Sequence, residues 1–493
     1  MKYCLKYWRK LLFLILLAMM SAMAKAQSNF SFYSFDDQFN SSDYNPAFLT
    51  SSQKFTFTIF PIGGTSFGYN NQAEIRNMIS QFLDGISTDN DYQKVFERMT
   101  GQTTFHQNLE SSLLSFTYRS NIGFFNFRIK ECESFSASVE GDLTKFIFKP
   151  EINSAFIDQV QHLPLQILHY REFSLGYSYK SRMNRFSAGI RAKMYFGKSA
   201  FYSGVSGSIK EESDDFVFRT WGLVNMSFPD AKVLNPDGTQ SIYDNSESKI
   251  MNYFFNKGNP GFGVDLGIKY SINPKLTFSM SAIDLGKISW KTNLNSKYFN
   301  GECLIPNNTI TKSTTDQAVQ IITKTLENYS YSDSVAEMFN LTIDRSTFAR
   351  PLPLTIYTGM KYRLSTNLSI SLTDRYVKVK DMDFNSFSVT ANYNVNKELS
   401  VSTGYSAIGD SYINLPLAFL LKKKYGQIYI GTDNLVSILV PSFTNYAGLS
   451  FGACFYLFTK RDLYWKPSDE LPFYKPRKIK KNKKNGQILK AFT

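Results

Sequence analysis

Four charged side chains stand in otherwise apolar stretches, where they could act on a solute. Arg191 and Lys193 are two residues apart in one stretch, and Asp265 and Lys269 are four apart in another. Even spacing places side chains on the same face of a β-strand, and two bases on one face are difficult to place in a packed core. A water-filled lumen accommodates them. Two roles remain open: an electrostatic filter for anionic or amphipathic solutes, or a salt-bridge network that fills the interior.

Catalytic chemistry has few candidates. The chain has three histidines, His106, His162 and His169, and a hydrolase needs a Ser or Asp constellation around one of them. His169 stands close to Arg171 and Glu172, which is typical of rim residues that tie down a loop. The cysteines beyond residue 26 have neither disulfide nor metal-ligand spacing. We predict that the protein is not an enzyme, with no catalytic, cofactor-binding or metal site.

The charged positions belong to strands. Between Gly261 and Trp290, two runs of alternating apolar and polar residues flank a turn at 271–275, which predicts an antiparallel hairpin. Similar runs continue over residues 112–458, and we count about 16 strands, with 14 as the alternative. The strands that the count treats as separate include 125–129, 135–139, 186–196, 201–209 and 216–228. The alternation suits both a lipid-facing barrel and the core of a soluble sandwich.

The connections separate these two folds. The short turns include 181–184, 211–215 and 271–275. The long connections are 141–170, 229–261 and 291–352. Outer-membrane barrels have short periplasmic turns and long extracellular loops. The chain is therefore predicted to be all-β, a transmembrane antiparallel β-barrel over residues 112–458. An even strand number leaves both termini in the periplasm.

The first 26 residues have the pattern of a secretory signal peptide. A basic start precedes an apolar run from Leu11 to Met20, and Ala24-Lys25-Ala26 forms a small-x-small cleavage site. That run is too short to span a bilayer, and no later run reaches the length of about 18 apolar residues that a transmembrane helix needs. We expect export to the outer membrane of a Gram-negative cell. A soluble exported β protein is the remaining alternative.

Residues 27–111 differ from the strands that follow. A helical spacing of apolar residues occurs at Ile75, Met78, Ile79 and Phe82. We expect a partly helical segment that plugs or caps the barrel, or else a helix packed on a sheet edge. Asn45, Pro46 and Ala47 are candidates for a hatch turn, although a plain turn started by proline accounts for them equally well.

The formal net charge of +14 is concentrated at the two ends of the chain. Residues 1–26 hold five bases, and residues 460–493 carry a net charge of +8, so the remainder is close to neutral. A nucleic-acid-binding face is therefore not expected. Residues 459–493 form a basic periplasmic tail, either merely solvated or bound to an anionic partner or lipid head groups. Its candidate binding residues are Lys478, Lys480, Lys481, Lys483 and Lys484.

Four segments, 169–197, 261–290, 352–364 and 426–455, follow the early SSDYNPAFL in a definite order and spacing. With this order and spacing, the chain resembles a widespread family of outer-membrane barrels of unknown function. The resemblance extends over nearly all of the chain between the signal peptide and the tail. The resemblance implies an outer-membrane barrel and no particular activity. Asn45-Pro46-Ala47 is also similar to the N-terminal hatch segment of FadL-type hydrophobic-compound transporters and of PorV-type barrels of a protein secretion system.

Two functions are compatible with these features. The first is passive transport of small hydrophobic or amphipathic compounds across the outer membrane, which the Asn45-Pro46-Ala47 segment favours. The alternative is a non-transporting scaffold or secretion-accessory barrel that binds a periplasmic or secreted protein through its long loops or its tail. Outer-membrane lipid surrounds the barrel in both, and neither involves nucleic acid or a cofactor.

Overall fold

The computed structural model describes most of the region between residues 30 and 457. The described residues are 30–35, 38–48, 54–71, 102–120, 123–140, 160–181, 185–212, 215–228, 253, 255–305, 342–380, 382–409, 411–439 and 446–457. The predicted signal peptide, the helical spacing at 75–82 and the tail lysines lie outside these residues.

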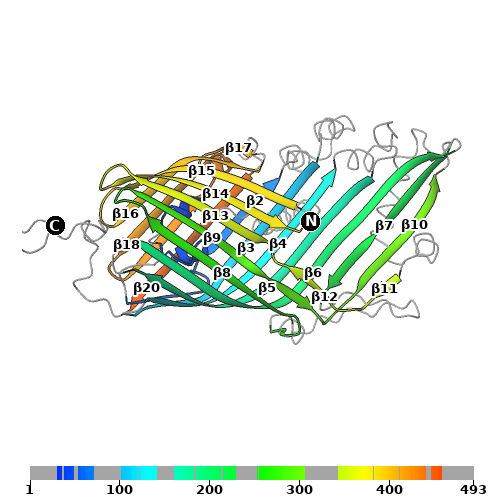
Figure 1. The fold of residues 1–493 in the computed structure, drawn as a ribbon, viewed down its shortest axis with the longest axis horizontal. Coiled ribbons are helices and arrows are strands. Elements are labelled where there is room, and N and C mark those ends of the chain that lie inside the picture. The colour runs from blue at the N-terminus through cyan, green and yellow to red at the C-terminus, as the bar shows by residue number, and fades with distance from the viewer. Residues whose placement is uncertain are drawn as a thin grey trace, which may run out of the picture.

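One antiparallel sheet closes on itself to form a barrel (Figure 1). Its wall has 14 strands, with β1 and β2, β12 and β13, and β17 and β18 each acting as one interrupted strand. The ring closes because β20 pairs with β1 and β2, which in turn pair with β3. The wall strands are β1 (Phe55–Ile59), β2 (Thr65–Asn71), β3 (Gln102–Arg119), β4 (Phe124–Glu140), β5 (Val160–Lys180), β6 (Phe186–Glu212), β8 (Pro260–Ser271), β9 (Leu276–Trp290), β12 (Phe348–Pro351), β13 (Leu354–Arg363), β14 (Leu368–Val379), β15 (Met382–Asn394), β16 (Leu399–Ile408), β17 (Ser411–Asn414), β18 (Leu417–Lys423), β19 (Gly426–Thr432) and β20 (Tyr446–Leu457).

The expected number of about 16 wall strands is wrong, and 14, the alternative, is correct. β4 and β6 are each one long strand where the sequence pattern indicated two, and the 216–228 run is β7 (Asp215–Ser227), which lies outside the wall. β1 and β2, within the expected plug, supply a wall strand that the count omitted. Alternation has the same period in wall strands and outside strands, so it does not tell them apart.

The length of β6 explains the outside strands. Its first part, Phe186 to Phe196, pairs with β8 in the wall, while Ala200 to Glu212 pairs with β7 instead. β10 (Ser296–Ile305) then pairs with β7, and β11 (Thr342–Asp344) with β10. These strands extend the sheet beyond one end of the barrel (Figure 1). The 211–215 turn between β6 and β7 is therefore at the end of the barrel that has the long connections, and not, as expected, at the end that has the short turns.

Several segments expected to be plug or loop are strands. β3 begins at Gln102, within the range 27–111, and β5 begins at Val160, within the expected loop 141–170. The expected partly helical plug is not confirmed, since the described part of it contains only α2 (Phe30–Tyr33) and η1 (Ser41–Asp43) as helices. A short helix, α9 (Leu435–Leu439), follows β19. Among the described residues, no helix has the length and hydropathy to cross a membrane.

Side chains of the wall alternate between an apolar outer face and a polar inner face. On β8, Phe262 and Leu266 are 68% and 45% exposed, while Asp265 is fully buried. The inner face is rich in buried hydroxyls, such as Ser281 and Thr373. In water this arrangement leaves a large apolar surface exposed, whereas an outer-membrane barrel places the same band in lipid. The distribution is the inverse of that in a soluble sandwich.

The two ends of the barrel differ. At the short-turn end, the connections between wall strands are 120–123, 181–185, 272–275, 364–367, 395–398 and 424–425. The first and last wall strands meet at this end, where Phe55 is paired with Leu457. The connections at the opposite, long-loop end include 72–101, 141–159 and the stretch between β9 and β12. The wall therefore has the asymmetry that the sequence predicted.

Candidate functional site

Residues 30–35 and 38–48 lie inside the barrel, and we call this segment the hatch (Figure 1, blue). Its aromatic side chains are buried and form the core of an otherwise polar lumen. Tyr33 stacks on Tyr357 of β13 with ring centroids 5.1 Å apart, and Phe32 meets Tyr429 of β19 at 4.8 Å. The hatch is therefore packed against strands that are not neighbours in the wall.

The Asn45-Pro46-Ala47 segment is the turn that attaches the hatch to β8 and β9. Asn45 Oδ1 accepts a hydrogen bond of 2.9 Å from Ala47 N, which closes the turn. Asn45 Nδ2 donates to the carbonyl oxygens of Ile268 and Met280, each at 3.2 Å. One fully buried side chain thus shapes the turn and also holds it to two wall strands.

Two glycines on the inner face make room for this turn. Gly189 of β6 and Gly267 of β8 lie opposite each other in the sheet. A Cβ atom at Gly189 would collide with the Pro46 carbonyl, and one at Gly267 with Asn45 Oδ1. Neither glycine has a positive φ, so the close approach of the hatch accounts for the residue type. Neither glycine was predicted to have a role from the sequence, although the place of Gly267 on the polar face of GFGVDLGIKY was an available signal.

Asp43 in the hatch is bound by three bases of the wall. Its Oδ1 contacts Arg128 Nη1 and lies 3.3 Å from Lys130 Nζ and 3.2 Å from Arg191 Nη1. Arg128 and Arg191 also donate to Ser42 Oγ, at 3.2 Å and 3.0 Å. Both guanidinium side chains are almost completely buried. Charges so far from water depend strongly on their partners.

Lys193 of β6 connects a second group of acids. Its Nζ lies 3.2 Å from Glu172 Oε2, 3.0 Å from Asp265 Oδ2 and 2.7 Å from Asp284 Oδ1. Arg191 Nη1 is 3.5 Å from Asp265 Oδ2, which joins this group to the Asp43 group. We call the whole the buried charge network; its members are Arg128, Lys130, Arg191, Lys193, Asp43, Glu110, Glu172, Asp265 and Asp284.

A bulge in β9 brings Asp284 into this network. Its φ of 65° is unusual within a strand, and the β8–β9 register shifts between Val264 and Leu266. Asp284 N donates to Asp265 Oδ1 at 2.8 Å. The bulge thus turns one more carboxylate toward Lys193, a contact that the alternation of β9 alone does not predict.

A pocket lies on each side of the hatch. Thr277 and Ser279 of β9 line one pocket, while Ile283 and Asp284 line the other. Between them, Ser281 Oγ donates to the Tyr44 carbonyl of the hatch at 2.6 Å. Since β9 starts at the short-turn end, we call the first the lower pocket and the second the upper pocket. The hatch therefore divides the lumen.

The upper pocket is lined largely by the buried charge network. Four acids and two bases face it, namely Asp43, Glu110, Glu172, Asp284, Lys130 and Lys193. Its empty space is about 400 Å³, including the part open to solvent. The lining thus has two more acids than bases, but the whole buried charge network, with five acids and four bases, is nearly balanced.

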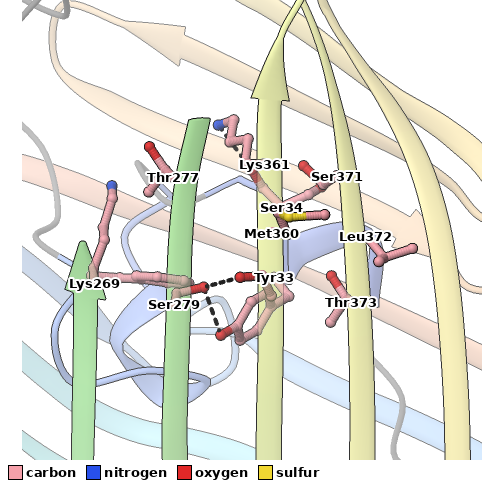
Figure 2. A pocket seen from close by; sticks show the side chains of 12 residues that line it. Tyr33, Ser34, Lys269, Thr277, Ser279, Met360, Lys361, Ser371, Leu372 and Thr373 are labelled. Atoms are coloured by element: carbon pink, nitrogen blue, oxygen red, sulfur yellow. Dashed lines mark hydrogen bonds between the residues drawn. The ribbon is translucent and has the colours of Figure 1, made fainter. Parts of the chain in front are cut away.

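The lower pocket has a different lining (Figure 2). Lys269 of β8 and Lys361 of β13 face it, and none of the described residues that line it is acidic. The other lining side chains include four wall hydroxyls and two hatch rings, Thr277, Ser279, Ser371, Thr373, Tyr33 and Phe48. Its empty space is about 300 Å³, again including the open part. Of the four charged residues singled out in the sequence, Lys269 alone lies here; Arg191, Lys193 and Asp265 are in the network.

The three histidines have different partners. His106 Nδ1 is 2.8 Å from Ser136 Oγ, and His162 Nδ1 is 2.8 Å from Ser206 Oγ. His169 Nε2 is 2.9 Å from Glu131 Oε1. Within the described ranges, no three His, Cys, Asp or Glu side chains are grouped so as to hold a metal ion.

Comparison with known proteins identifies a family. Residues 46–433 match a family described as of unknown function (DUF5723). This confirms the resemblance seen in the sequence. No curated protein matches the chain.

Three solved structures are similar to this chain at low identity. A FadL homologue of Pseudomonas aeruginosa has 11% identity and a TM-score of 0.39, with 88% of this chain and 99% of that chain covered. The toluene transporter TbuX of Ralstonia pickettii has 9% identity and a TM-score of 0.38, with 85% and 93% covered. The toluene transporter TodX of P. putida has 9% identity and a TM-score of 0.36, with 84% and 92% covered.

Proposed function

The chain belongs to the DUF5723 family of unknown function, and we propose that it is an outer-membrane channel in which the hatch gates passive transport of small hydrophobic or amphipathic compounds. The observation that carries this proposal is the pair of pockets on opposite sides of the hatch. A solute that passes a plug moves from a space on one side of it to a space on the other, and the two pockets supply such spaces. A barrel of 14 strands is also wider than one of about 8, whose interior is filled by its own side chains.

The way in which the hatch is attached supports a gating role. Its described backbone hydrogen bonds run within the segment, as from Phe48 N to Asn45 O at 2.9 Å. Its described contacts with the wall are hydrogen bonds and ion pairs that involve side chains, together with ring packing. Because none of these is a strand pairing, the hatch can shift without opening the wall.

The proposed orientation follows from the ends of the barrel. The short-turn end faces the periplasm and the long-loop end faces the outside of the cell. Both termini and the basic tail, residues 459–493, are then periplasmic. The lower pocket opens to the periplasmic side and the upper pocket lies toward the exterior.

The test of transport is to displace the hatch and measure conductance. Gly267→Ala and Gly189→Ala place a methyl group where Asn45 and Pro46 now lie. We expect both variants, reconstituted in planar bilayers, to conduct more than the unmodified protein, and liposomes that contain them to take up small aromatic alcohols faster. Gly204→Ala is the matched control, since its Cβ would meet its nearest neighbour only at 3.9 Å.

Gel mobility with and without boiling shows that each variant is a folded barrel. If both glycine variants and a deletion of residues 30–48 stay closed and exclude solutes, the transport proposal is rejected. A closed barrel of that kind favours the scaffold alternative.

A further inference from the structure

We propose that the place in which the Tyr33 ring lies, here called the Tyr33 site, is a binding site for the solute, and that this site takes a single-ring phenol. In the structure the hatch fills the site with its own side chain. The proposal rests on the proposed function, because it names the kind of solute that the channel passes. Three features carry it: the contacts of the ring, the contact of the hydroxyl group and the way in which this part of the hatch is held.

The first feature is a space shaped for a flat ring. Tyr33 stacks on Tyr357 with an interplanar angle of 20°, and the Phe48 ring meets it in a T-shaped arrangement with centroids 5.0 Å apart. Gly359, two residues after Tyr357 in β13, leaves the room, since a Cβ atom there would be 2.5 Å from Tyr33 Cε1. Glycine inside a strand often marks such a close approach. The wall and the hatch therefore enclose a space for one aromatic ring.

The second feature is an acceptor for the hydroxyl group of that ring. Ser279 Oγ donates to the Gly359 carbonyl at 3.4 Å and lies 3.1 Å from the Tyr33 hydroxyl (Figure 2). A serine hydroxyl has one proton to donate, so the Tyr33 hydroxyl is the donor to Ser279. Ser279 is buried, and a site built around a buried hydrogen bond rejects a ligand that cannot make it. The Tyr33 site thus matches a ring with a donating hydroxyl group, as in a phenol.

The third feature is the attachment of residues 30–35, which we call the hatch arm. Their sequence, FSFYSF, includes no carboxylate, lysine, arginine or histidine. The Ser34 carbonyl accepts from Lys361 Nζ at 3.3 Å, and Ser34 Oγ donates to an asparagine of β15 at 2.6 Å. Residues 38–48 are instead anchored by Asp43, which contacts three bases of the wall. Release of the hatch arm breaks no ion pair, whereas release of residues 38–48 takes a shared partner from buried charges.

The position of the Tyr33 site connects binding to the gate. Tyr33, Phe48, Ser279 and Gly359 all line the lower pocket, so a solute in that pocket contacts the ring that it replaces. A phenol in the site makes the ring contacts and the hydrogen bond that Tyr33 makes now, and the Tyr33 side chain has to leave. Binding is therefore expected to displace the hatch arm, while residues 38–48 stay in place.

The test is binding of p-cresol, which has the ring and the hydroxyl group of a tyrosine side chain, to the full chain in detergent. We expect saturable binding of p-cresol, and about fivefold weaker binding of toluene and 4-methylanisole, which have no hydroxyl group to donate. Bound p-cresol should also speed amide hydrogen exchange in residues 30–35 and leave exchange in residues 38–48 unchanged.

Three variants locate the binding. Tyr33→Ala removes the competing side chain, so p-cresol should bind about tenfold more tightly than to the unmodified protein. Gly359→Ala, added to Tyr33→Ala, places a methyl group in the space for the ring and should abolish this binding. Gly204→Ala in the same background is the matched control and should keep the affinity, since its Cβ would meet its nearest neighbour only at 3.9 Å. Gel mobility with and without boiling checks the fold of each variant.

Four results would each overturn the proposal. In the first, p-cresol binds to Tyr33→Ala alone and not to the unmodified protein, so that the truncation has merely made a cavity. In the second, toluene and 4-methylanisole bind as tightly as p-cresol. In the third, exchange in residues 30–35 does not respond to p-cresol. In the fourth, Tyr33→Ala binds p-cresol no more tightly than the unmodified protein does, or Gly359→Ala leaves its affinity intact.

The outcome is separable from that of the proposed function. Binding of p-cresol with displacement of the hatch arm, in a barrel that never conducts, leaves the site and removes the channel. Conductance and solute uptake without p-cresol binding leave the channel and remove the site.

Discussion

The lysines of the upper and lower pockets differ in their neighbours and in their exposure. Lys193, with 3% of its side chain exposed, is surrounded by Glu172, Asp265 and Asp284 at 3.2 Å or less. Lys269 and Lys361 are partly exposed beside hydroxyls and rings. A charge whose neighbours already balance it stabilises the fold and attracts little else. The lower pocket combines its lysines with wall hydroxyls and hatch rings. Under the proposed function, the charges of the upper pocket hold the hatch in the barrel, and the lower pocket lies on the path of the solute.

The largest expected effect is a difference in unfolding free energy between a variant of Lys193 and a variant of Lys269. Lys193→Met takes the shared partner from Asp284 and from the buried carboxylates of Glu172 and Asp265. Removal of one member of a buried ion pair costs about 3–5 kcal/mol. Lys269→Met removes a partly exposed charge, for which the cost is about 1 kcal/mol or less. Denaturant unfolding in detergent measures both. Equal costs for the two variants would contradict the comparison.

The next effect concerns the attachment of the hatch. Asp43→Asn keeps the size of the side chain but takes the negative charge from Arg128, Lys130 and Arg191. We expect faster amide hydrogen exchange in residues 38–48 and a higher conductance, while exchange in β14 and β15 stays the same. Ser34→Ala, which removes a hydrogen bond to Asn392 of 2.6 Å, should have a smaller effect, of about 1 kcal/mol. If Asp43→Asn leaves exchange unchanged, the network does not hold the hatch.

A third prediction concerns ion selectivity once the hatch is loosened. In a Gly267→Ala background, the lower pocket should favour chloride over potassium, since two ammonium groups line its path. Adding Lys269→Glu and Lys361→Glu should move the reversal potential in a KCl gradient toward cation preference. Lys378→Glu is the control for an added charge elsewhere. A reversal potential that is the same in all three proteins would mean that ions do not pass the lower pocket.

The smallest effect is expected from salt. Raising ionic strength from 0.1 M to 1 M shortens the screening length from about 10 Å to about 3 Å. The chloride preference of the Gly267→Ala protein should weaken, because the lower pocket is open to solvent, whereas the unfolding free energy contributed by the buried charge network should change little. Reversal potentials and unfolding curves at the two salt concentrations measure this. A fractional loss of stability as large as the loss of selectivity would show that the network is not shielded.

Much of the wall was predictable from the residues. The alternation of Phe262 to Tyr270 with glycine and charged residues indicated one lipid-facing side, and its apolar members Phe262, Leu266 and Tyr270 are indeed exposed. The strand number was overestimated, since β4 and β6 were each counted as two strands and β7 lies outside the wall. The polar face of β8 was predicted to line a lumen, but the need for a glycine at position 267 was not predicted. The Asn45 side chain, which leaves no room for a Cβ atom there, lies more than 200 residues earlier in the chain.

By itself, the sequence determined which side of each strand is apolar and which end of the barrel has short turns. Both are local properties, set by a period of two and by the spacing between runs. The tertiary structure alone decided how many strands close the ring, and which charge meets which. Arg191 is 148 residues from Asp43 and 74 from Asp265. The first pair forms only when the hatch enters the barrel, and the second only when β6 pairs with β8. No local pattern shows which charges a buried base will contact.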